Sequence, residues 1–212
     1  MSYLDAHFWA GFTLFAFAAS VTPGPNNMMM MASGANFGLA RTLPHMAGVV
    51  FGFTVLILAV GLGLGALLTA WPALHAILYW AGSAYLLWLA WRIASAGTVG
   101  AVEAGRPRNF WEIVAFQWVN PKAWTGALGA VATYAPPENY YANLAIICAI
   151  FAGVNIPVAF LWTTGGAALK GLLADARALR AFNIAMALLL VISIPPIADG
   201  EAKLWQSLLA AR

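Results

Sequence analysis

The chain has 212 residues, of which 63% are hydrophobic and only 8% are charged. A soluble domain usually carries about 25% charged residues, so a single water-soluble core is excluded and the bilayer must solvate much of this chain. The net charge of +3 comes from dispersed basic residues, not from a basic cluster that would bind nucleic acid. The single cysteine, Cys148, allows neither an intramolecular disulfide nor a cysteine-based metal site.

Uncharged stretches predict an all-α integral membrane protein with six transmembrane helices, because one span needs about 20 apolar residues. Between Arg41 and Arg92 lie 50 uncharged residues. As one helix they would be about 75 Å long, against a hydrocarbon core of about 30 Å, so the chain must turn back. We place this turn at Pro72, because proline suits the first turn of a helix. The predicted spans are 8–31, 43–68, 71–93, 113–134, 141–168 and 181–198.

Basic residues predict the orientation of these spans, because cytoplasmic loops are enriched in lysine and arginine. The loops on one side carry Arg41, Arg92, Arg106, Arg108, Lys170, Arg177 and Arg180, whereas the other side carries Lys203 and Arg212. We therefore expect an inner (plasma) membrane protein with both termini outside. The whole chain, 1–212, forms a single transmembrane domain. It comprises a first repeat (8–93), a cytoplasmic loop (95–112), a second repeat (113–198) and an interfacial tail (199–212).

Matching signals in the two halves indicate an inverted repeat. Residues 21–25 (Val-Thr-Pro-Gly-Pro) and 119–122 (Val-Asn-Pro-Lys) both place a small polar residue before a proline in the middle of a predicted span. An Ala-Gly-Val triplet then follows in the next helix of each half, around Gly48 and Gly153. Each half has three helices, so the second half must be inverted relative to the first. Secondary transporters are commonly built this way.

The prolines predict that helices 1 and 4 are broken mid-membrane. Non-helical backbone persists at that depth only where it is buried in protein or faces a water-filled cavity. The half-helix after Pro25 would present free N–H groups and a partial positive charge to a substrate carboxylate, and Asn26 and Asn27 would add donors. A kink used only for packing is the alternative. The candidate substrate-binding residues are Thr22, Pro23, Gly24, Pro25, Asn26, Asn27, Asn120, Pro121, Lys122 and Asn155.

Two of the basic side chains are candidates for proton coupling. Lys122 is the only charged residue well inside a predicted helix, where an ammonium group is costly. It could bind a carboxylate, carry a proton or cap carbonyls freed by the break, and simple snorkelling is the alternative. His45 follows Pro44 at the start of the second predicted helix, where it could carry a coupling proton or cap the helix. The Gly48/Gly52 and Gly61/Gly65 pairs permit close helix contact, within the monomer or across a homodimer.

In combination, these motifs resemble the lysine-exporter (LysE/RhtB-type) translocator family over nearly the whole chain. The segments that carry the resemblance are 22–27 (Thr-Pro-Gly-Pro-Asn-Asn), 33–38 (Ser-Gly-Ala-Asn-Phe-Gly), 48–52, 82–89 and 120–123. The resemblance implies export of amino acids or close derivatives from the cytoplasm, driven by the proton-motive force. One position departs from the pattern: many members carry aspartate directly after the second glycine of 48–52, and this chain has Phe53.

The Phe53 departure shapes the expected substrate. With no other carboxylate deep in a span, a cationic side chain would meet no counter-charge, so we expect a neutral amino acid. Efflux of another small metabolite or of a metal ion is an alternative, although the spans hold no cluster of metal ligands. A membrane-embedded enzyme is a second alternative, although its candidate residues show no catalytic spacing: Ser20, Ser33, His45 and His75. We expect a transporter without cofactor or resident metal, whose partners are an amino acid, the lipid bilayer and, as an option, a second copy.

Overall fold

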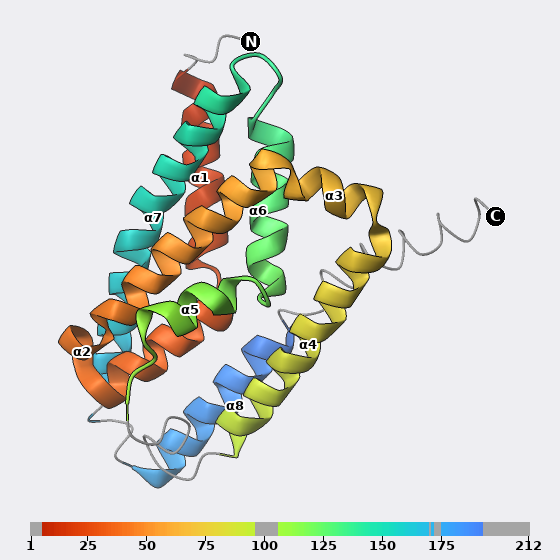
Figure 1. The fold of residues 1–212 in the computed structure, drawn as a ribbon. Helices are drawn as coiled ribbons and strands as arrows, with labels where there is room; N and C mark the ends of the chain where they lie inside the picture. The colour runs from red at the N-terminus through yellow and green to blue at the C-terminus, as the bar shows by residue number, and fades with distance from the viewer. Residues whose placement is uncertain (1–5, 96–105, 170, 172–174, 193–212) are drawn as a thin grey trace.

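The computed structural model describes residues 6–95, 106–169, 171 and 175–192, and every regular element within them is a helix (Figure 1). In chain order the elements are α1 (Ala6–Val21), α2 (Pro25–Ala59), the π-helix η1 (Val60–Leu64), α3 (Gly65–Ala70), α4 (Pro72–Ala94), α5 (Phe110–Gln117), α6 (Pro121–Tyr134), α7 (Tyr140–Leu169) and α8 (Ala176–Ile192). By length and composition, the helical stretches Pro25–Leu68 and Tyr140–Leu169 could each cross a membrane. The all-helical, apolar architecture predicted from composition is therefore confirmed.

Large apolar side chains cover much of the outer surface. Leu14, Leu62, Ile77, Leu161 and Ile192 are each more than half exposed. A soluble monomer rarely exposes apolar side chains on this scale. Lipid, in contrast, is an apolar solvent for them, so the surface of the structure agrees with the composition of the chain.

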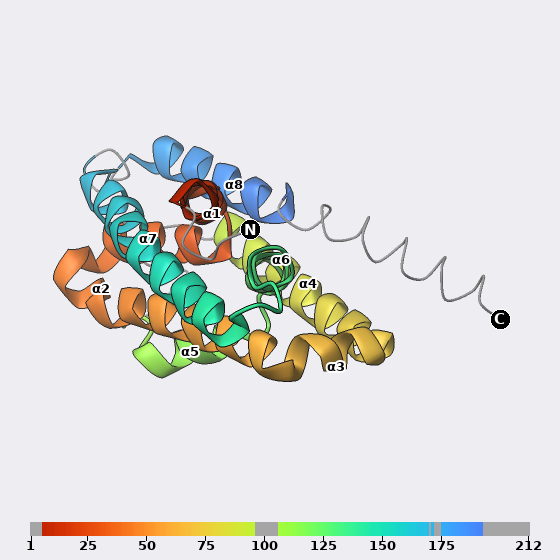
Figure 2. The same ribbon diagram turned by 90° about the horizontal axis from the view of Figure 1, so that it is seen from above.

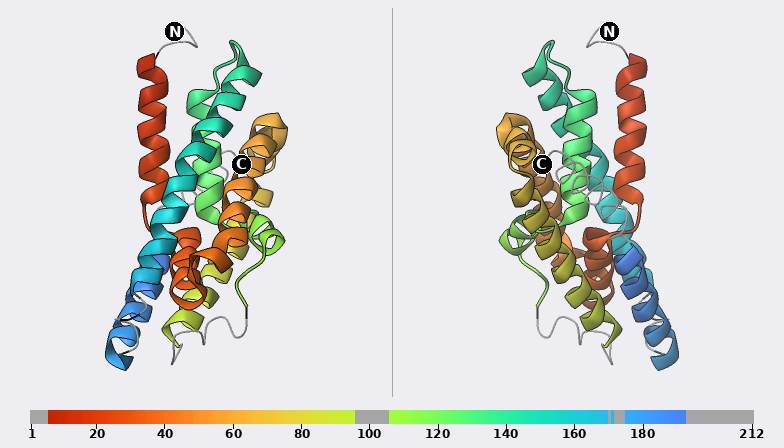
Figure 3. Two further views of the ribbon diagram at one scale, coloured as in Figure 1. Left: turned by 90° about the vertical axis from the view of Figure 1, so that its left-hand side faces the viewer. Right: turned by 90° about the vertical axis from the view of Figure 1, so that its right-hand side faces the viewer.

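Both predicted helix breaks are present. The helix α1 ends at Val21 and α2 begins at Pro25, while α5 ends at Gln117 and α6 begins at Pro121. Each new helix starts with proline, whose missing N–H is not needed in a first turn. Figure 3 shows the short non-helical connection between α1 and α2. The break predicted at residues 69–72 is also present, since α3 ends at Ala70 and α4 begins at Pro72.

The predicted start of the second helix, at residue 43, is wrong. Helical structure begins directly after Gly38, and Pro44 lies inside α2 instead of at its start. Gly38 has φ 75° and ψ 173°, a conformation that only glycine adopts readily, and it bends α2 sharply into two arms (Figure 1). Ser33 and Thr42 share a 3.0 Å hydrogen bond across this bend, and the Thr42 hydroxyl donates to the Gly38 carbonyl at 2.8 Å.

The π-helix η1 was not predicted. It continues α2 at Val60 and contains Gly63, whose φ of 128° is again open mainly to glycine. The Tyr140 hydroxyl, from the start of α7, donates a 2.7 Å hydrogen bond to the Gly61 carbonyl. This hydrogen bond joins the start of α7 to the π-helix.

Of the last two helices, α7 matches its predicted span, whereas α8 begins earlier than predicted. The helix α7 begins and ends within one residue of the predicted span 141–168. The helix α8 begins at Ala176 and not at 181, because the Asp175 carboxylate accepts hydrogen bonds from the N–H groups of Arg177 and Ala178. Most of the loop 95–112, the end of the sixth predicted span and the tail 199–212 lie outside the described residues.

A capping box begins α5. The Asn109 side chain accepts from the Glu112 N–H at 2.9 Å, and the Glu112 carboxylate accepts from the Asn109 N–H at 3.0 Å. The Arg106 guanidinium also hydrogen-bonds this carboxylate and holds the pKa of Glu112 below its usual range. Glu112 therefore stays charged at the positive end of the short helix.

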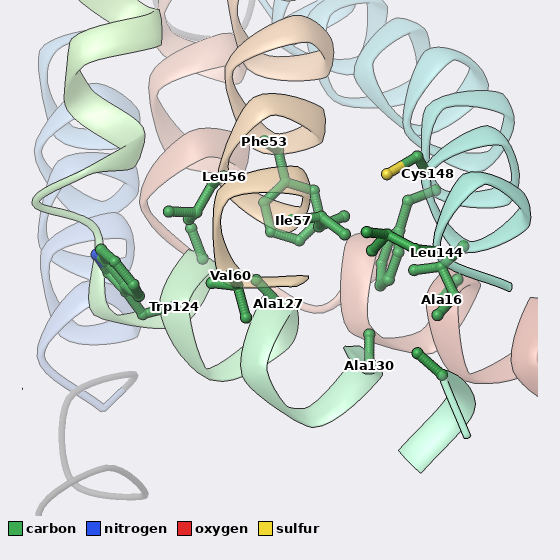
Figure 4. Packing of buried hydrophobic residues seen from close by; sticks show 14 of the residues in the cluster. Ala16, Phe53, Leu56, Ile57, Val60, Trp124, Ala127, Ala130, Leu144 and Cys148 are labelled. Atoms are coloured by element: carbon green, nitrogen blue, oxygen red, sulfur yellow. The ribbon is translucent and has the colours of Figure 1, made fainter. Parts of the chain in front are cut away.

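The helices pack into a main body and a pair. In the body, α2 lies along α7, which also contacts α1, and the short helices α5 and α6 pack on α2. Beside it, α4 and α8 pack mainly against each other, as Figure 1 shows. Figure 2 shows α7 lying across α2 in the main body. Buried side chains from α1, α2, α6 and α7 form the larger core cluster, part of which is drawn in Figure 4.

Glycines of the predicted contact motifs allow close helix packing within one chain. A Cβ atom added to Gly48 would come 2.7 Å from the Phe110 carbonyl oxygen, and one added to Gly61 would come 2.6 Å from a methyl group of Leu144. These glycines thus allow α5 and α7 to approach α2 and η1. They give no support to a homodimer, which stays a prediction.

Candidate functional site: a cavity at the two helix breaks

A cavity of about 270 Å³ lies where α1, α2, α6 and α7 meet. It far exceeds the roughly 30 Å³ share of one water molecule, and it is close to the roughly 300 Å³ at which ligand pockets begin. Its size suits a small metabolite. The polar side chains lining it are Ser20, Asn26, Asn27, Asn120, Lys122, Thr125 and Asn155, and the aromatic ones are Phe15, Phe53 and Phe151.

Most of the predicted site residues meet at this cavity. Gly24 and Pro25 line it together with Asn26, Asn27, Asn120, Lys122 and Asn155. The other three contribute differently: Thr22 and Pro23 supply backbone carbonyls that bind Lys122, and Pro121 is buried at the start of α6. The predicted approach of the two breaks to each other is therefore present in the structure.

Lys122 joins the second break to the first. Its Nζ donates to the Thr22 carbonyl at 2.5 Å and to the Pro23 carbonyl at 3.3 Å. These carbonyls follow the last turn of α1, where no further helical N–H groups are available. Of the roles considered for Lys122, the structure shows the capping of freed carbonyls. An ammonium group has three donors, so Lys122 could also bind an anion in the cavity that it lines.

Gly24 makes room for this lysine. Its backbone is extended, with φ −176° and ψ 177°, so any residue could adopt its conformation. A Cβ atom there, however, would come 2.7 Å from Lys122 Cδ and 2.9 Å from Nζ. The glycine at this position is thus explained by the space that the lysine side chain fills.

The Asn27 side chain has a role different from the one expected. Its Nδ2 donates to the Ser20 carbonyl at 2.8 Å and to the Thr22 carbonyl at 2.9 Å. Both amide hydrogens are therefore bound to the end of α1, and Asn27 is no longer a donor for a substrate. What it can offer the cavity is its side-chain oxygen, an acceptor.

The two half-helices that begin at the breaks are capped differently. Asn120 caps α6, because its side-chain oxygen accepts from the Lys122 N–H at 3.2 Å. The helix α2 begins after Gly24 with no side-chain cap. The N–H groups in the first turn of α2 are thus left to a ligand or to water, together with the positive end of the helix dipole.

Gln117 is a site residue that the sequence reading missed. Its side chain, fully buried at the end of α5, makes a reciprocal pair with Asn26: Asn26 Nδ2 donates at 2.9 Å, and Gln117 Nε2 donates back at 3.1 Å. Gln117 Nε2 also donates to the Ile113 carbonyl at 3.1 Å. The pair ties the start of α2 to the second break. A polar amide in an apolar segment, three residues before Asn120, was the available signal.

Loss of the amide pair is expected to destabilise the protein measurably. Gln117→Leu removes one partner and leaves the Asn26 amide unsatisfied, which typically costs about 1–3 kcal/mol. In the double variant Asn26→Leu/Gln117→Leu no amide is left unpaired, so the loss should be smaller than the sum of the single losses. Unfolding of the four proteins in detergent measures the coupling. Additive losses would show that the pair contributes nothing.

His45 does not line the cavity. It is fully buried inside α2, and neither of its ring nitrogens has a hydrogen-bond partner among the described residues. The alternative that His45 caps a helix at the interface is therefore wrong, because α2 already runs through Pro44. Coupling of protons by His45 stays a prediction.

The profile of the LysE type translocator family matches residues 17–193. This chain belongs to that family. The cysteine/O-acetylserine efflux protein of Salmonella typhimurium is 33% identical over 189 residues, covering 86% of this chain and 93% of the relative. The protein of the same name from Escherichia coli K12 is 32% identical over the same shares. No solved structure gives a significant match.

The family resemblance drawn from the motifs is thus confirmed. This LysE-type chain is a membrane transporter for amino-acid efflux, and the alternative of a membrane-embedded enzyme is set aside.

Proposed function

We propose that this LysE-type translocator exports a neutral amino acid and binds it in the cavity at the two helix breaks. The observation that carries the proposal is the charge of the lining: Lys122 is present, and no aspartate or glutamate of the described residues lines the cavity. An amino-acid carboxylate would bind near Lys122 and the uncapped start of α2. A cationic side chain would meet repulsion from Lys122 and no counter-charge.

The rest of the lining supports a neutral zwitterion as the substrate. The ammonium group of an amino acid needs acceptors, which Asn27 and Asn155 offer as side-chain oxygens. Phe53 and Phe151 give the cavity an apolar side, suited to an uncharged side chain. Cysteine and O-acetylserine, named for the relatives, are amino acids with uncharged side chains, and close analogues of them are the substrates to test first.

Efflux from loaded cells tests this function. Cells that overproduce the protein are loaded with a labelled amino acid, and its release is followed with and without a proton gradient. We expect faster release of cysteine or serine than from control cells, and loss of the difference when the gradient is collapsed. Selective release of lysine or arginine would contradict the proposal.

The same proposal includes six spans in two inverted repeats within one transmembrane domain, with the breaks near the middle of the inner membrane. Three features support it: the paired breaks, the long helices α2 and α7, and the packing of α4 against α8, which hold the third place in their respective halves. Proton-motive force is the proposed energy source, with Lys122 and His45 as the candidate coupling groups.

The proposed orientation makes a labelling prediction. The turn between α6 and α7, which contains Glu138, lies at the end of the molecule where α1 begins, and the segment that leads into α5, which contains Arg106, runs towards the other end (Figure 3). In a Cys148→Ser background, Glu138→Cys should react with an impermeant thiol reagent added to intact cells, whereas Arg106→Cys should react only in inside-out vesicles. The reverse pattern would place both termini in the cytoplasm.

A further inference from the structure

Phe53 forms part of the apolar wall of the cavity. Its ring packs edge-to-face on Phe151 of α7, with the ring centroids 5.1 Å apart and the planes at 86°. The tip of the ring faces α6: a Cβ atom added to Gly126 would lie 3.4 Å from Phe53 Cζ and 3.9 Å from Cε2. The ring therefore reaches from Phe151 on α7 towards α6, where a methyl group at position 126 would just come into ordinary contact with it.

The position of Gly126 on α6 shows how far this wall lies from Lys122, the charged end of the cavity. Gly126 lies four residues after Lys122 on α6, so both residues share one face of the helix. Four residues of α-helix rise about 6 Å along the axis. A ligand whose carboxylate binds Lys122 would thus meet the Phe53 ring about one helical turn away.

We propose that Phe53 sets the upper size of the substrate side chain. The inference rests on the proposed function and narrows it to amino acids with short side chains. A longer or branched side chain would have to displace the Phe53 ring, which packs on Phe151 and points towards α6. The cavity volume of about 270 Å³ agrees with a short substrate.

Phe12 offers a matched control. It is fully buried in the same cluster and also packs on Phe151, with ring centroids 5.4 Å apart, but it does not line the cavity. Phe12→Ala therefore removes comparable core packing without changing the wall. Any effect of Phe53→Ala beyond that of Phe12→Ala reports on the cavity.

Inhibition of transport by a side-chain series tests the inference. Proteoliposomes transport a labelled short amino acid, and each of five unlabelled amino acids is added in turn as a competitor: alanine, 2-aminobutyrate, norvaline, norleucine and phenylalanine. Phe53→Ala should lower the inhibition constant of norleucine relative to alanine by about tenfold or more, the scale of a few methylenes in an apolar pocket. Phe12→Ala should leave this ratio unchanged. Gly126→Ala, whose added Cβ atom would meet the ring only at ordinary contact distance, should also leave the ratio unchanged.

The outcomes distinguish the size limit set by Phe53 from the proposed export function. If Phe53→Ala does not fold, Phe53→Leu keeps most of the packing and should shift the ratio in the same direction. An unchanged ratio in transport-competent Phe53 variants would overturn the inference and leave the proposed function intact. A wild-type protein that no neutral amino acid inhibits would overturn the proposed function itself.

Discussion

Replacing Lys122 with glutamine should lower the rate of neutral amino-acid export by roughly tenfold to a hundredfold. Hydrogen bonds to charged groups contribute about 1.5–3 kcal/mol, and each 1.4 kcal/mol is a factor of ten. Glutamine removes the charge but keeps two N–H donors for the Thr22 and Pro23 carbonyls, on a side chain one bond shorter than that of lysine. Initial export rates, normalised to the amount of protein in the membrane, measure the effect.

Two further variants separate charge from position. Lys122→Arg keeps the charge and should retain more export than Lys122→Gln. Gly24→Ala keeps the lysine but forces it to move, since the added Cβ atom would lie 2.7 Å from Lys122 Cδ, and export should again fall. Export of wild-type rate and selectivity by Lys122→Gln would show that the lysine only caps α1.

The largest loss of stability is expected at the crossing of α2 and α7. A Cβ atom added to Gly34 would overlap the Thr163 carbonyl group, and one added to Gly166 would overlap the Met31 carbonyl group. The contacts join backbone to backbone, so no side chain can rotate to relieve them. We expect Gly34→Ala and Gly166→Ala each to cost about 3 kcal/mol or more, at the upper end for overpacking of a core.

Gly165 provides the control for this prediction. It neighbours Gly166 on the same helix, yet an added Cβ atom would meet only the flexible end of Met31, at 4.0 Å. Gly165→Ala should therefore behave like the wild type in the yield of monodisperse protein and in unfolding temperature in detergent. Equal behaviour of all three alanine variants would show that the close crossing is not required.

The features that the sequence predicted well are those with a local cause. Pro25, Pro72 and Pro121 each begin a helix, because proline cannot supply the N–H that a helix interior needs. Asn120 and Lys122 are next to one of these prolines, so a position at the cavity followed from the break. The general character of the helices followed from their apolar composition.

The features that it missed depend on contacts between distant segments. Asn26 and Gln117 are 91 residues apart, and their reciprocal pair exists only because the two breaks come together. The bend at Gly38 was missed because a single glycine inside a helical pattern is usually tolerated. The role of Asn27 changed for a related reason: the carbonyls that it binds are free only once α1 ends at Val21.

Competition between an amino acid and its carboxamide tests the central claim most directly, because the two differ only in the charged carboxylate. In proteoliposomes transporting a labelled neutral amino acid, unlabelled amino acid should inhibit the wild-type protein at least about tenfold better than its carboxamide, the scale of one charge-assisted hydrogen bond. In Lys122→Gln this difference should largely disappear. Equal inhibition of the wild-type protein by both compounds would contradict carboxylate binding at Lys122 and the start of α2.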